Sequence, residues 1–160
     1  MPPLEPIEYR AIRALQAQLG AMSVAEGYHY DLAVSEVRLD PNVDVESLIA
    51  PGGPRPFAAI EVRPDVRDYF PADQVTIVLP VTIHWVNTAV PADDESRLQV
   101  LLRGVADIER AICVDQSLGG LVMDTRMVNR AFDAQDGGAL VWLSVDLELR
   151  IYRTYGQPDS

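Results

Sequence analysis

The chain has 160 residues, 48% of them hydrophobic and 23% charged, and its 24 acidic and 13 basic side chains give a formal net charge of −11. That length and composition suit one folded domain over residues 1–160, and the acidic balance disfavours both phosphate-based nucleic-acid binding and docking on anionic membranes. Every basic residue is Arg, which excludes Schiff-base and P-loop chemistry because both require a lysine amine.

We expect neither a secretion signal nor a membrane span in this chain. Its opening residues, MPPLEPIEYR, lack a basic segment followed by an apolar run, and no later stretch approaches the ~18 apolar residues of a membrane span. We expect the protein to be made in the cytoplasm in soluble form. Cys113 is the only cysteine, so the sequence allows no internal disulfide and no thiolate zinc cluster.

The N-terminal half combines one helix with short extended segments. A helix is predicted to start near Glu5 or Pro6, since proline is tolerated in a first turn, and its apolar stripe consists of Ala11, Ile12, Leu15, Leu19 and Met22. Residues 28–38 resemble a strand loosely, and residues 40–56 a loop with one helical turn at Val45–Ile49. A short strand is predicted at Phe57–Val62, followed by another loop at residues 63–73.

Two later segments show strong strand patterning. Alternate residues are apolar throughout 75–86 and 143–152, which predicts strands with one buried face, as in an antiparallel sheet covered on one side. Pro80 cannot donate a ladder hydrogen bond, so its strand is predicted to lie at an edge or to carry a bulge there. A further strand at 121–132 is predicted to join the last one through the hairpin loop DAQDGG.

The clearest helix lies between these strands. Asp93 is its predicted N-cap, and about 21 helical residues would span ~31 Å, which requires the helix to lie across the sheet. Cys113 is expected in the core on its apolar face. The buried stripe of this helix is predicted to hold Leu98, Leu101, Leu102, Val105, Ile108 and Ile112.

The order of elements predicts an α+β fold. We expect an antiparallel sheet of about four to five strands, with two main helices packed on one face.

No motif for catalysis or cofactor binding stands out. A histidine metal site would need His29 and His84, but their spacing does not require one, and half-exposed strand positions explain both. There is no G-x-S-x-G and no phosphate-cradling loop. Helix capping explains the carboxylate pair Asp93–Asp94, and a solvated strand face explains Asp146–Glu148. We therefore predict no catalytic, cofactor-binding or metal-binding residue, and no enzymatic activity.

The loop that follows the strand at Phe57–Val62 is a candidate for a protein contact. It brings together Arg63, Arg67, Tyr69 and Phe70, and arginine with aromatic residues is typical of interface hot spots. An equally good explanation is that Tyr69 and Phe70 cover an edge of the core.

Four segments carry a family resemblance: AIRALQAQLGAMSVAEGYHYDL, VTIVLPVTIHWV, LLRGVADIERAICVDQSLGGLVMDTR and a closing ALVWLSVDLELRIYRTYGQP. A helix followed by D-x-x-L-G-G-x-V, and a final strand ending in Y-R-x-x-G-x-P, are the parts that match. In this order the segments resemble the tail-terminator (tail-completion) proteins of long-tailed bacteriophages over most of the chain. The Pro-rich loops at 40–56 and 63–71 depart from that pattern.

The resemblance implies an α+β subunit of a homo-oligomeric, hexameric ring in the virion, at the head-proximal end of the tail. Such a ring caps the tail tube, ends its polymerisation and offers a docking face to the head-completion (stopper) protein, while DNA passes through without specific binding. An acidic lumen would repel phosphate, and Asp146 and Glu148, on an exposed strand face, are the candidates to line it.

Two alternatives stay open at this point. A head–tail adaptor or neck protein would also be an acidic ring. A small cytoplasmic ligand-binding domain or enzyme would instead use His29 or His84 near a cleft.

Overall fold

The computed structural model describes residues 5–49, 55–70, 74–89 and 93–154. Its helices are α1 (Ile7–Leu19), α2 (Val45–Ile49) and α3 (Asp94–Val114), with short 3-10 turns η1 (Val24–Glu26), η2 (Val34–Glu36) and η3 (Asp136–Gly138). The strands are β1 (Ala21–Met22), β2 (Leu32–Ala33), β3 (Val37–Asp40), β4 (Phe57–Val62), β5 (Val66–Phe70), β6 (Gln74–Thr88), β7 (Asp124–Gln135) and β8 (Leu140–Thr154).

The fold is α+β, as predicted, but the sheet is larger and more mixed than expected. Six strands form it in the order β3-β4-β6-β8-β7, with β5 paired to β6 beyond the end of β4. All pairs are antiparallel except β3–β4, which run parallel across a connection that contains α2. The prediction of four to five antiparallel strands was therefore wrong in number. It missed β5, because the charged residues of VRDYF gave no apolar alternation, and we had assigned them to a loop.

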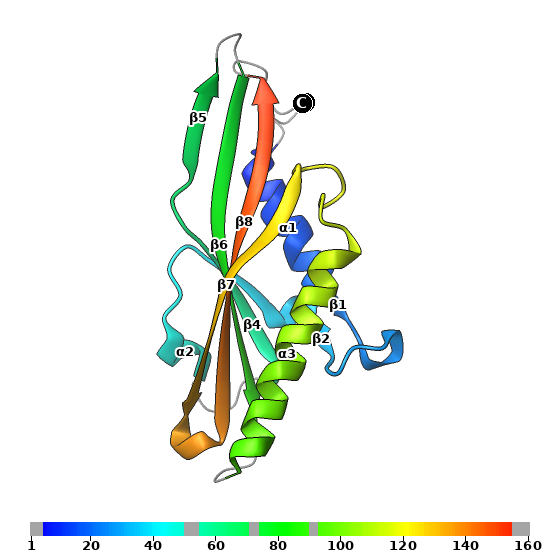
Figure 1. The fold of residues 1–160 in the computed structure, drawn as a ribbon, viewed down its shortest axis with the longest axis vertical. Helices are drawn as coiled ribbons and strands as arrows, with labels where there is room; N and C mark the ends of the chain where they lie inside the picture. Colours follow the sequence, from blue (N-terminus) through cyan, green and yellow to red (C-terminus); the bar gives the residue numbers. More distant parts are fainter. Residues whose placement is uncertain (1–4, 50–54, 71–73, 90–92, 155–160) are drawn as a thin grey trace.

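The two long helices cover one face of this sheet and the short helix covers part of the other (Figure 1). The main core joins α1 and α3 to alternate residues of β6 and β8, with Trp85, Leu143 and Leu147 among its fully buried side chains. On the opposite face, Leu48 of α2 packs with Ala59 and Val86 in a smaller cluster. Much of that opposite face carries polar side chains, and we call it the helix-free face because neither long helix lies on it, although the five-residue α2 covers one part.

Helix α3 begins as predicted, because the side chain of Asp93 accepts a hydrogen bond from the backbone of Ser96 at 3.1 Å. Its buried arc, however, was partly mispredicted: Leu98 and Leu102 are 52% and 45% exposed, and Cys113 is exposed. The physical reason is the small residue Gly104, which lets the helix approach the ring of Trp85 so closely that the buried arc is centred away from these three side chains.

Pro80 lies inside the sheet and pairs in regular register with Glu148, so the prediction that β6 is an edge strand or carries a bulge at this proline was wrong. The proline is tolerated because it falls where β6 changes partners, between the last pair with β4 (Val62–Val81) and the first with β5 (Val66–Val78). Its carbonyl accepts a hydrogen bond from the backbone of Arg63 at 3.0 Å. The missing N–H therefore faces a gap between two strands and leaves no neighbour unsatisfied.

The C-terminal hairpin is confirmed, with β7 shifted along the chain from the predicted range. Gly137 and Gly138 adopt φ values of 66° and 90° in the connection, a conformation that other residues rarely adopt. One irregularity interrupts the β7–β8 ladder between Met127 and Asn129, where Val128 bulges out of register.

Candidate functional site

His29 is held on the helix-covered side of the molecule by Asp107 of α3. The carboxylate, which is 4% exposed, accepts hydrogen bonds from the backbone N–H groups of His29 and Tyr30 at 2.9–3.0 Å and contacts the His29 Nδ1 at 2.8 Å. Burial raises the pKa of the neighbouring Tyr30 phenol, and Arg103 opposes that rise in part. These contacts fasten the segment before β2 to α3, which is a structural role.

His84 lies on the helix-free face, in a second polar cluster. Its ring is 6% exposed, stacks on Trp142 at a centroid distance of 5.7 Å, and has Nε2 2.7 Å from Oε2 of Glu61. The indole Nε1 of Trp142 donates to Nδ1 at 3.3 Å. Because an indole can only donate, Nδ1 must be the unprotonated nitrogen and Nε2–H must donate to Glu61. Every ring nitrogen is thus already satisfied.

The two histidines therefore lie on opposite faces of the sheet and share no site. Within the described ranges no group of three or more His, Cys, Asp or Glu side chains could hold a metal ion. None of the helices in that part of the chain is both long enough and apolar enough to cross a membrane.

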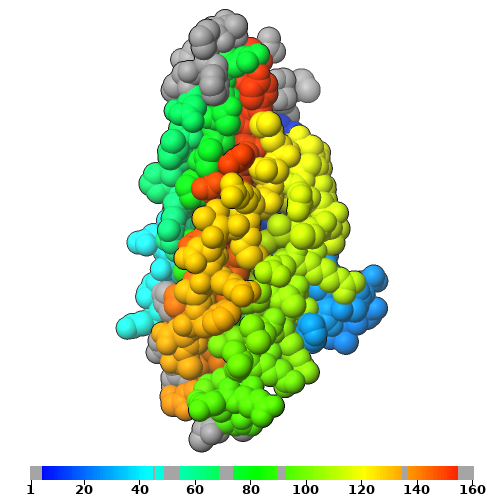
Figure 2. Space-filling model, viewed as in Figure 1, coloured from blue at the N-terminus to red at the C-terminus, as the bar shows by residue number. Residues whose placement is uncertain are grey.

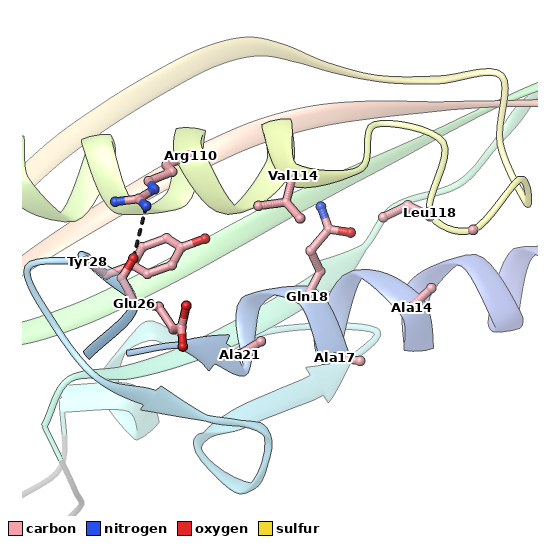
Figure 3. A pocket seen from close by; sticks show the side chains of 10 residues that line it. Ala14, Ala17, Gln18, Ala21, Glu26, Tyr28, Arg110, Val114 and Leu118 are labelled. Atoms are coloured by element: carbon pink, nitrogen blue, oxygen red, sulfur yellow. Dashed lines mark hydrogen bonds between the residues drawn. The ribbon is translucent and has the colours of Figure 1, made fainter. Parts of the chain in front are cut away.

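A hollow of about 620 Å³ lies between α1 and α3 (Figure 3). Its walls include Ala14 and Ala17 of α1 and Val114 of α3. Gln18 bridges the helices by donating to backbone carbonyls at the end of α3, the shortest contact being 2.5 Å to Ala111. Arg110 donates to the carbonyl of Gly27 at 2.6 Å. Gln18 and Arg110 of this hollow are thus engaged in joining α1, α3 and the η1 segment.

Two of the predicted interface residues, Arg63 and Arg67, lie on opposite faces of the sheet. Arg63 approaches Asp146 on the helix-free face at 3.8 Å, whereas Arg67 contacts Glu8 of α1 on the helix-covered face at 3.3 Å. The backbone of Tyr69 and Phe70 belongs to β5, but their side chains lie outside the described residues. A contact role for these four residues stays a prediction.

The predicted lumen residues do share a surface. Asp146 and Glu148 line a hollow of about 190 Å³ on the helix-free face, together with Arg63, Thr82 and Val128. Asp146 accepts a hydrogen bond from the hydroxyl of Thr82 at 2.7 Å and lies near the guanidinium of Arg63. Its charge is partly balanced, which leaves Glu148 as the more available acid of the pair.

Strand β7 forms a long edge of the sheet. In the described part of the chain it pairs with β8 alone, and residues 128–134 are exposed. It lies beside α3 on the same face of the molecule (Figure 2), and Arg130 of β7 approaches Glu109 of α3 at 3.8 Å. Exposed apolar side chains on these two elements include Leu98, Leu102, Val128 and Phe132.

Sequence reasoning missed this surface. The sequence of β7, TRMVNRAFDA, has no clear alternation of apolar and polar residues. This lack of alternation is itself a signal of an exposed edge strand, because a strand exposed on both faces has no buried face to impose a period of two. A free strand edge with exposed apolar neighbours is the part of the molecule best suited to bind another polypeptide.

Comparison with known proteins adds no relative: no protein-family model matches the chain, and no curated protein matches it significantly.

Proposed function

We propose that this chain is a ring-forming virion protein of a long-tailed bacteriophage, the tail terminator that caps the tail tube, ends its polymerisation and provides the docking face for the head. The resemblance of the sequence segments described above supports the family assignment. The assembly role has independent support in the surface of the subunit.

The observation that carries the proposal is the edge of β7. Among the described residues, this strand of 12 residues pairs on one side only, which leaves a row of backbone donors and acceptors available for another chain. Monomeric proteins usually shield such an edge with prolines, charges, bulges or a covering element. β7 has one bulge, at Val128, yet Val128 and Phe132 stay 56% and 40% exposed along the edge. A subunit that is completed by its neighbours in a ring accounts for both features.

The helix-free face supports the second half of the proposal. It carries Asp146 and Glu148 on β8, and the chain as a whole has a net charge of −11. If this face lines the ring, its acids repel DNA phosphates and let a duplex pass without binding. The long helices α1 and α3 would then lie on the outside of the ring.

The test is assembly of the purified chain. Light scattering after size-exclusion chromatography gives the mass of the particle, and negative-stain imaging shows whether it is a closed ring. Added to polymerising tail-tube protein, the chain should arrest tube growth and be found at one tube end only. A particle that is a monomer at every concentration, alone and with tail tubes, would overturn the proposal. A ring that ignores tubes but binds a portal would favour a head–tail adaptor.

A further inference from the structure

We propose that the ring is built by strand addition: β5 of one copy pairs antiparallel with β7 of the next, with Asp68 opposite Arg126. This inference rests on the proposed ring function and names the two surfaces that form its subunit contact. The occupant of the β7 edge is therefore a second copy of this chain, bound through a different edge of the same sheet.

Strand direction allows this pairing. At the end of the sheet that contains β5, the strands follow the order β5-β6-β8-β7, and each neighbouring pair is antiparallel. The first and last strands of this run therefore point in opposite directions. A copy related by rotation about an axis along the strands keeps its strand directions, so its β5 meets β7 antiparallel and the alternation continues from subunit to subunit.

Charge selects the register. Asp68 lies opposite Thr76 of β6, which places it on the helix-free face, and it is exposed. Of the β7 residues on that face, Arg126 alone is basic, and it is exposed as well. The other described side chains of β7 on this face are Asp124, Val128, Asn129, Ala131 and Asp133. Pairing Asp68 with Arg126 sets opposite charges across the two strands, which is a favourable cross-strand pair.

The same register also covers two apolar side chains, Val66 and Val128, that are exposed in the single chain. Counting back from Asp68 and forward from Arg126, Val66 falls opposite Val128. Both side chains lie on the helix-free face, Val66 through its pair with Val78 and Val128 beside Thr82 and Asp146. They are 58% and 56% exposed in the single chain. The pairing brings these two apolar side chains together and removes both from water.

The stagger fits a closed ring. Within one subunit, Asp68 pairs with Thr76, and Thr76 pairs with Tyr152. If the β7–β8 register is extended by two residues beyond the pair Asp124–Arg150, position 122 lies opposite Tyr152, four residues before Arg126. Along the run β5-β6-β8-β7, which leaves out β3 and β4 at the other end of β6, each subunit therefore adds a shift of four residues, or one residue per strand. A shear equal to the strand number corresponds to a strand tilt of about 36°, which is within the range of closed barrels.

The resulting ring has a usable width. For six copies, strands ~4.8 Å apart and tilted by about 36° give a backbone circumference of roughly 140 Å and a diameter of roughly 45 Å. Such a ring has an open channel, lined by the helix-free face if α1 and α3 lie outside.

Disulfide cross-linking tests the register directly. In a Cys113→Ser background, the double variant Asp68→Cys with Arg126→Cys should give a ladder of multimers on non-reducing gels, ending at the ring size. The control pairs Asp68→Cys with Asp133→Cys, which lies on the same face of β7 in another register, and should stay uncrosslinked. Dimers formed by Arg126→Cys alone would show a two-fold β7–β7 contact and overturn the proposal.

Charge reversal gives a second readout. Asp68→Arg and Arg126→Asp should each weaken assembly roughly tenfold or more by placing like charges together, and the double reversal should restore it. Thermal unfolding of each variant checks that the subunit still folds. Rings that form without the 68–126 cross-link would refute this contact and leave the proposed function standing. Cross-linked rings that fail to cap tail tubes would do the reverse.

Discussion

Asp107 and His29 are joined through both backbone and side chain: one buried carboxylate on α3 accepts the backbone N–H of His29 and contacts its Nδ1 at 2.8 Å. A carboxylate that is 4% exposed is stable there because these donors, with the N–H of Tyr30, replace water. The long segment between α1 and β3 is thereby fixed to the middle of α3.

Replacing Asp107 with Ala should destabilise the fold by about 2–4 kcal/mol, since it leaves the backbone donors of His29 and Tyr30 without their acceptor. Chemical denaturation measures the loss. His29→Ala is the matched control, because it keeps both backbone hydrogen bonds to Asp107 and should cost less. Equal losses for the two variants would show that the ring contact, and not the backbone anchoring, carries the energy.

Gly104→Ala should destabilise the protein although alanine is the better helix former by ~1 kcal/mol. A Cβ at this position would lie 2.7 Å from Cζ3 of Trp85, whose side chain is 1% exposed and has no room to move. Overpacking of this kind costs about 1–3 kcal/mol, so the steric effect exceeds the gain in propensity.

A double-mutant cycle checks the cause of that loss. In a Trp85→Phe background the six-membered ring of the indole is gone, and Gly104→Ala should then cost clearly less. A cost that is independent of residue 85 would contradict the steric explanation.

Asp115, just after α3, should give a pH-dependent contribution to stability. The Ser117 hydroxyl, with the backbone N–H groups of Gly119 and Ser117, donates to its carboxylate at 2.6–2.9 Å and holds its pKa below the ordinary value of 3.8. The folded state thus favours the ionised form. Its contribution is present at neutral pH and is lost as the pH falls below 3.8 through the folded pKa.

The variant Asp115→Asn isolates this contribution. Other carboxylates titrate equally in both proteins, so the difference in unfolding free energy between them should be largest near neutral pH and shrink on acidification. A difference that stays constant down to strongly acidic pH would show that the charge of Asp115 is not involved.

His84 should be found as the Nε2–H tautomer, because Trp142 donates to its Nδ1 and Glu61 accepts from its Nε2. The nitrogen chemical shifts of the ring distinguish the tautomers by NMR. Trp142→Phe keeps the stacking but removes the donor, and should allow the other tautomer to appear. A ring already populated as Nδ1–H in the unmodified protein would contradict the hydrogen-bond assignment.

The sequence alone determined the elements whose side chains follow a single strong period. β6, β8, α1 and the start of α3 at Asp93 were predictable because burial on one face imposes a regular pattern, and capping follows from residue type. The hairpin between β7 and β8 was predictable from its glycines. The α+β class follows from their order.

Only the tertiary structure decided which faces and edges are covered. β5 and β7 lack a clear period because both are edge strands with exposed side chains on both faces, so burial does not impose alternation on them. Their pairing therefore depends on contacts distant in sequence. The exposure of Leu98 and Leu102 depends on how closely Gly104 approaches Trp85, a distance that no helical pattern contains. The acidity that first excluded nucleic-acid binding is set by composition, whereas tertiary contacts determine that Asp146 is balanced by Arg63 and that β5 and β7 both lie at edges of one sheet.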